Sequence, residues 1–122
     1  MTLPAAIKRT NTILYAKRWK KTVDFYRDRL GLEIAYQCDW FVEFRLTRTA
    51  FLSVADQSRA TIPSADGKGI TLSFQIDDLQ TAHNEFIIDG LAPTKIRSNV
   101  MEADVFYLFD PEGNRLEFWR PS

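Results

Sequence analysis

The sequence predicts an α+β fold built from two βαβββ units, because one pattern occurs in it twice. Thr12–Leu32 and Thr71–Leu91 each contain an alternating strand, an amphipathic helix and a glycine, with an offset of about sixty residues between the copies. A stretch rich in β-forming and turn residues follows each copy. A chain of 122 residues suits one domain with a hydrophobic core. We expect a single domain with a first unit over residues 8–55, a linker over 56–69 and a second unit over 70–120.

The first unit opens with a strand over Thr10–Ala16, in which successive side chains belong to opposite faces. Apolar residues at positions 19, 23, 26 and 30 then follow a helical period. We expect this helix to begin near Arg18 and to end at Gly31, since glycine is common just after a helix. Three β-rich runs complete the unit: Leu32–Tyr36, Trp40–Leu46 and Ala50–Val54.

The second unit repeats this order after a polar linker. Alternation over Ile70–Ile76 predicts a strand that directs Leu72 and Phe74 toward a core. Asp77 or Asp78 can cap the following helix, and the stripe of Leu79, Ala82 and Phe86 ends at Gly90. The remaining strands are expected at Leu91–Arg97, Ala103–Phe109 and Arg115–Trp119.

Composition excludes several classes of function. Sixteen acidic side chains balance sixteen basic ones, so the chain lacks the excess positive charge that nucleic-acid binding uses. No apolar run approaches the roughly 20 residues of a membrane helix. Cys38 is the single cysteine, and the N-terminal sequence has no apolar signal core. We expect a cytoplasmic protein that binds neither nucleic acid nor membrane.

Three segments carry a resemblance to a known family. TILYAKRWKKTVDFYRDRLGLEI resembles the opening of the vicinal-oxygen-chelate superfamily, which includes glyoxalase I, bleomycin-resistance proteins and extradiol dioxygenases. SFQIDDLQTAHNEFIIDGL is similar to its second-half counterpart, and FYLFDPEGNRLEFWRP is similar to its closing hairpin. The resemblance implies two modules whose strands form a curled mixed sheet around a cavity, with the helices outside.

The resemblance also implies where metal ligands would lie. Metal-dependent members commonly have a histidine on the first strand of each half and a glutamate on the last strand. The two histidine positions fall on Asn11 and Thr71, and only Glu117 matches a family ligand. A fourth position falls near Phe51 or Leu52. A neutral amide and a hydroxyl are weak donors for zinc, nickel or iron, so we expect no bound metal and no cofactor.

Glu117 has two interpretations. Strand alternation groups it with Arg115 and Trp119, on the side away from the helix and toward the cavity. It could form a structural ion pair with Arg115 or Arg45. It could instead anchor a cationic or hydroxyl-bearing ligand, or act as a general base.

Two further features have simpler interpretations. His83 lies within the second helix beside its apolar stripe, so we expect a surface or half-packed histidine rather than a ligand. The basic run Lys17–Lys21 begins the first helix, where positive charge opposes the helix dipole. It is either a solvated face or an anion-binding site.

These observations favour a metal-independent small-molecule-binding protein of the glyoxalase/bleomycin-resistance type. Its ligand would occupy the sheet cavity or a dimer groove. The alternative is a lyase, isomerase or dioxygenase relative that uses Glu117 as base or metal ligand. We expect a homodimer, because open sheets leave edges that must be covered. The expected ligand-binding residues are Asn11, Tyr15, Thr71, Gln75, Arg115, Glu117 and Trp119.

Overall fold

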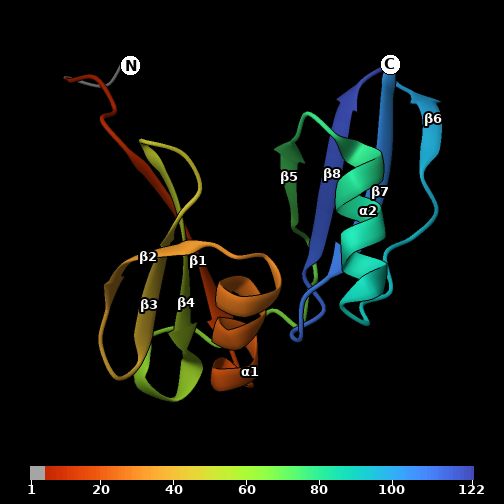
Figure 1. The fold of residues 1–122 in the computed structure, drawn as a ribbon. Coiled ribbons are helices and arrows are strands. Elements are labelled where there is room, and N and C mark those ends of the chain that lie inside the picture. The colour runs from red at the N-terminus through yellow and green to blue at the C-terminus, as the bar shows by residue number, and fades with distance from the viewer. Residues whose placement is uncertain (1–4) are drawn as a thin grey trace. The chain divides into compact units, whose positions relative to one another are not determined.

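A computed structural model describes residues 5–122 and divides the chain into two compact units, Met1–Ser64 and Ala65–Ser122. We call these units the first and the second module. Each contains one four-stranded mixed sheet and one helix (Figure 1). Within the described residues, no helix is long and apolar enough to cross a membrane.

The first module has the strand order β1-β4-β3-β2. Strands β1 and β4 are parallel, and the other two pairs are antiparallel. The helix α1 continues directly into one turn of π-helix, Phe25–Arg29. The elements are β1 (Thr10–Ala16), α1 (Trp19–Asp24), β2 (Glu33–Gln37), β3 (Phe41–Arg45), β4 (Ala50–Asp56) and a short 3₁₀ turn (Gln57–Arg59).

The second module has the equivalent strand order, β5-β8-β7-β6, with β5 and β8 parallel. The remaining pairs are again antiparallel. Its elements are β5 (Thr71–Gln75), α2 (Leu79–Ile88), β6 (Arg97–Val100), β7 (Ala103–Phe109) and β8 (Arg115–Pro121). The repeated order confirms the predicted α+β class with two βαβββ modules.

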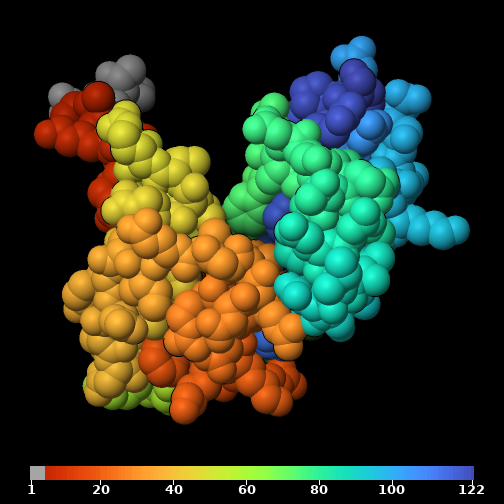
Figure 2. All heavy atoms as spheres, viewed as in Figure 1, coloured from red at the N-terminus to blue at the C-terminus, as the bar shows by residue number. Residues whose placement is uncertain are grey.

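Strand alternation gives each sheet one face toward the helix of its own module. In the second module this face carries Phe106 and Phe118, whose rings stack at 5.3 Å, and the Phe86 ring of α2 contacts both. The outer side of α2 is exposed along its length (Figure 2). In the first module, the buried apolar residues of the helix and of the sheet face toward it include Leu14, Ala16, Val23, Phe25, Tyr26, Val42, Phe44, Leu52 and Val54. We call the opposite side of each sheet its distal face.

Both helices end at the predicted glycines. Gly31 and Gly90 have φ of +69° and +81°, a conformation that glycine adopts without strain. After Gly90, the Leu91 amide donates to the Phe86 carbonyl at 2.9 Å, which closes the last turn. At the start of α2, the N-cap is Asp78, since the Thr81 amide donates to its carboxylate. This hydrogen bond is the main cause that lowers the pKa of Asp78.

The strand expected over Leu91–Arg97 is wrong, because β6 begins only at Arg97. Pro93 has no amide hydrogen to donate to a sheet. At Thr94 the amide donates to the Tyr107 carbonyl, but the Tyr107 amide donates to the Thr94 hydroxyl. A side chain therefore replaces one main-chain acceptor, and the segment lies beside β7 without forming a regular ladder.

Two glycine substitutions test how local backbone geometry limits this fold. Gly31→Ala should lower the free energy of unfolding by about 1–2 kcal/mol, the cost of a left-handed alanine, because the space around Gly31 is open. Gly67→Ala should lower it further, since its Cβ would overlap the Gly113 carbonyl. Urea denaturation of both variants makes the comparison. Equal losses would show that the Gly67–Gly113 contact is not tight.

Candidate functional site

The distal face of the second sheet carries five of the seven predicted ligand-binding residues. Parallel pairing of β5 with β8 aligns Thr71 with Arg115 and Gln75 with Trp119. Glu117 lies on β8 between Arg115 and Trp119. Because side chains alternate along a strand, all five share one face. Thr71, Gln75 and Arg115 are exposed, and Glu117 and Trp119 are half-buried.

Arg115 is held in place by two neutral neighbours. Its Nε donates a hydrogen bond to Thr71 Oγ1 at 2.9 Å. Its guanidinium carbon lies 4.5 Å from the centroid of the Tyr107 ring, in a cation–π contact. The sequence analysis missed Tyr107, although β7–β8 pairing opposite Glu117 puts it on this face.

Glu117 accepts a hydrogen bond from the Ser73 hydroxyl at 2.6 Å. The structural alternative that paired Glu117 with Arg115 is wrong, because within the described residues Arg115 forms no ion pair. In the first module, Arg45 Nε lies 3.7 Å from Glu33 Oε1. Glu117 therefore keeps its second carboxylate oxygen, Oε2, without a protein donor in the described part of the chain.

A hollow of about 440 Å³ lies next to Arg115. Gly67 and Gly69 line one part of it, and both have positive φ. Gly67 also packs against the Gly113 backbone, which fixes the linker to the β7–β8 turn. The full lining is Gly67, Gly69, Ile70, Thr71, Phe109 and Arg115.

In the first module, Asn11 belongs to a polar network on the distal face. Its Oδ1 accepts a hydrogen bond from the Ser53 hydroxyl at 2.8 Å, and its Nδ2 donates to Glu43 at 3.4 Å. Arg9 pairs with the other Glu43 oxygen at 3.0 Å and covers the Phe51 ring at 3.8 Å. Ser53 is completely buried, so its hydrogen bond to Asn11 contributes to the stability of the fold.

Strand register shows which residue of the first module corresponds to Glu117. Thr71 pairs with Arg115, and Glu117 follows Arg115 by two residues. Asn11 pairs with Phe51, and the equivalent residue two positions on is Ser53. By this correspondence the fourth position points to Ser53, the next residue after the expected Phe51 or Leu52. The sequence could not fix this position, because the loops between the strands differ in length between the two repeats.

The residues that the family resemblance assigns to ligand positions do not fit a transition metal. Asn11 Oδ1 and Thr71 Oγ1 already accept hydrogen bonds, and the donor to Thr71 is a cation. A metal ion at Thr71 would meet the charge of Arg115 directly. Across residues 5–122, no three His, Cys, Asp or Glu side chains gather closely enough to hold a metal ion.

Tyr15 lines a separate, aromatic hollow of about 170 Å³ in the first module. Its walls include Trp40 and Phe41, whose ring centroids lie 5.5 Å apart. At the rim, Arg59 pairs with Asp39 at 3.2 Å. Flat aromatic walls suit a planar group. The remaining lining residues are Ile13, Ala55, Ala60 and Thr61.

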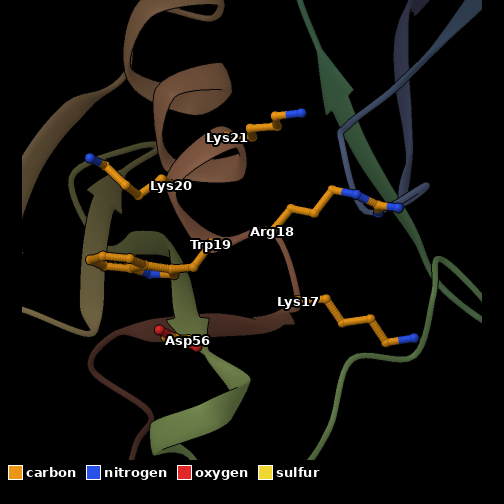
Figure 3. A pocket seen from close by; sticks show the side chains of 6 residues that line it. All are labelled: Lys17, Arg18, Trp19, Lys20, Lys21 and Asp56. Atoms are coloured by element: carbon orange, nitrogen blue, oxygen red, sulfur yellow. The ribbon is translucent and has the colours of Figure 1, made fainter.

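The basic run Lys17–Lys21 surrounds a hollow of about 390 Å³ together with Asp56. Figure 3 shows that Lys20 extends to one side and that Lys17, Arg18 and Lys21 extend to the other with their ends spread apart, so the four cations do not converge. Trp19 is fixed separately, because its indole nitrogen donates to the Val54 carbonyl at 2.9 Å. The diverging cations favour the solvated-face interpretation.

His83 is half-buried, in agreement with the sequence analysis. Its Nε2 lies 2.9 Å from the Thr94 carbonyl, and its ring meets Phe106 edge to face. This places His83 among the residues that attach α2 to its sheet.

Comparison with known proteins places these modules in a family. A model of the Glyoxalase/Bleomycin resistance protein/Dioxygenase superfamily matches residues 7–118. The chain belongs to this superfamily. No curated protein matched it.

Several solved structures share this fold. A lactoylglutathione lyase from Agrobacterium tumefaciens is 28% identical, with a TM-score of 0.75, and the match covers 97% of this chain and 95% of that one. A glyoxalase/bleomycin resistance protein/dioxygenase from Nocardioides is 17% identical, with a TM-score of 0.80 over 98% and 86% of the two chains. An integron cassette protein from V. cholerae is 18% identical, with a TM-score of 0.74 over the full length of both chains.

The Asn11–Ser53 hydrogen bond can be tested by a double-mutant cycle. Asn11→Ala should lower the free energy of unfolding by about 1–3 kcal/mol, because it leaves the buried Ser53 hydroxyl without its acceptor. Adding Ser53→Ala should recover part of this loss. Gln75→Ala, at an exposed site, serves as the control and should change stability by no more than about 0.5 kcal/mol. Simple additivity of the two substitutions would show that the bond contributes nothing.

Proposed function

We propose that this chain is a metal-independent small-molecule-binding protein of the superfamily. One observation carries the proposal: Asn11, Ser53 and Thr71, which the family resemblance and the strand register assign to ligand positions, are neutral and already hydrogen-bonded. The superfamily model spans both modules, which supports their working as one functional domain. The proposed ligand-binding residues are Asn11, Tyr15, Thr71, Gln75, Arg115, Glu117 and Trp119.

The chemistry of these residues suits a polar organic ligand. The second module offers a carboxylate with a free oxygen at Glu117 and an indole at Trp119 on one sheet face. A hydroxyl or an amine of the ligand can donate to Glu117. The aromatic walls around Tyr15 add a place for a planar group in the first module.

A catalytic function is the second candidate, because the A. tumefaciens structure with 28% identity is a lactoylglutathione lyase. In that case Glu117 would be the base that removes a proton from the substrate. Its hydrogen bond from Ser73 orients the carboxylate and leaves Oε2 for the reaction.

We further propose a homodimer in the cytoplasm. Each sheet ends in two edge strands, β1 and β2 in the first module and β5 and β6 in the second. Such edges are usually covered. Exposed apolar side chains at Tyr36 and Phe109 would also lose contact with water in a dimer.

Metal analysis tests the proposed function most directly. Protein purified without a metal-affinity tag should contain no stoichiometric transition metal, and zinc or nickel should give no saturable heat in calorimetry. The triple variant Thr71→His/Ser73→His/Arg115→Ala should gain zinc binding, since two imidazoles then lie beside Glu117 on paired strands and the neighbouring cation is removed. A stoichiometric metal in the native protein would contradict the proposal.

The same preparation separates binding from catalysis. Turnover of S-lactoylglutathione by the native protein, lost in Glu117→Gln, would establish the second candidate in place of the first. Glu117→Gln keeps the side-chain shape and an acceptor for Ser73, so its fold should be unchanged.

The oligomeric state is tested by sedimentation at micromolar concentration. The expected species has twice the 14.1 kDa mass of the chain. A single species at the monomer mass across the concentration range would rule the dimer out.

A further inference from the structure

Arg115 has no carboxylate within ion-pair distance in the described part of the chain. Within residues 5–122, its contacts are the Thr71 hydroxyl at Nε and the Tyr107 ring, and neither is an anion. Other arginines differ in this respect. Each of five lies within ion-pair distance of a carboxylate: Arg9, Arg27, Arg45, Arg59 and Arg120.

These two contacts orient the guanidinium without using its terminal nitrogens. Arginine has five N–H donors, and the bond to Thr71 uses the one on Nε. Tyr107 covers a flat face, so it leaves the in-plane donors free. The four remaining N–H groups on Nη1 and Nη2 form the fork that binds oxyanions through two parallel hydrogen bonds.

The adjacent hollow can hold the rest of such a molecule. Its volume of about 440 Å³ is within the range of small-molecule sites. Gly69 leaves open space where a side chain would stand, so a ligand can approach its backbone. Ile70 and the half-exposed Phe109 provide apolar contact.

We propose that this hollow binds a small organic oxyanion, a carboxylate in the first instance, through the fork of Arg115. The proposal deepens the proposed function and rests on it. Glu117 lies two residues along the same strand face, so the ligand should have its anionic group at Arg115 and a donor group on the Glu117 side. Because Glu117 balances the charge nearby, recognition depends on the geometry of the fork more than on net charge.

Nuclear magnetic resonance of the full chain tests the proposal with defined probes. Benzoate should shift the Arg115 Nε–H signal and the Thr71 and Gly69 amide signals in a saturable way. Benzamide has the same shape without the charge and should bind at least about tenfold more weakly. Phenyl phosphate tests whether the site prefers a phosphate to a carboxylate. If it binds more tightly than benzoate, the site is assigned to phosphate esters.

Variants of Arg115 test whether benzoate binding depends on the geometry of the guanidinium or only on its positive charge. Arg115→Gln and Arg115→Lys should both weaken benzoate binding by about tenfold, since lysine keeps the charge but loses the bidentate geometry. Arg120→Gln is the matched control on β8, because Arg120 contacts Asp104 and lies on the other face. It should bind benzoate like the native chain. Thr71→Val should give a smaller loss, since it only releases Nε.

Three results would overturn the proposal: no saturable shift with benzoate or phenyl phosphate, equal binding of benzamide, or equal weakening by Arg120→Gln. The native spectrum alone decides the first two, so they do not depend on the folding of any variant. A chain that fails these tests but stays free of metal and binds a neutral aromatic probe at Tyr15 would retain the proposed function and lose only the oxyanion site.

Discussion

The parallel pairing of the first and last strands of each module is the constraint on which the rest of the structure depends. It aligns Thr71 with Arg115 and Ser73 with Glu117 in one module, and Asn11 with Phe51 in the other. Once this register is set, strand alternation decides which side chains meet the helix and which share the distal face. A shift by one residue would exchange the two sets. The hydrophobic pattern forbids that shift, because it would turn Leu116 and Phe118 away from α2.

Much of this fold could be predicted from local signals. Alternation located β1 to the residue, and the apolar stripes with Gly31 and Gly90 located both helix ends. The prediction failed where a contact between distant residues decides the structure. Thr94 disrupts the expected strand through a side-chain bond to Tyr107, thirteen residues away. No local propensity encodes such a pairing.

The candidate site was also predicted only in part, where local sequence signals were sufficient. The repeat placed Asn11 and Thr71 on the first strand of each module and Glu117 on the last strand of the second, and the structure agrees. Ser53 was missed because its position beside Asn11 depends on the register between β1 and β4. Tyr107 was missed because nothing in the sequence distinguishes it from the other aromatic residues. Each of these three side chains has a hydrogen-bond partner within its own module: Ser53 for Asn11, Arg115 for Thr71 and Ser73 for Glu117. These hydrogen bonds engage one acceptor oxygen of each side chain, an atom that could otherwise face a ligand.

The irregular segment before β6 has a consequence for solubility during synthesis and folding. Long regular edge strands present unpaired amides and carbonyls on which a second chain can add, and this is a common start of amyloid-like aggregation. Here β6, one of the two edge strands of the second sheet, is only four residues long. Pro93 and the Thr94 hydroxyl keep the preceding residues from extending it. At the β6 edge, a nascent second module therefore exposes little template for another copy of the chain.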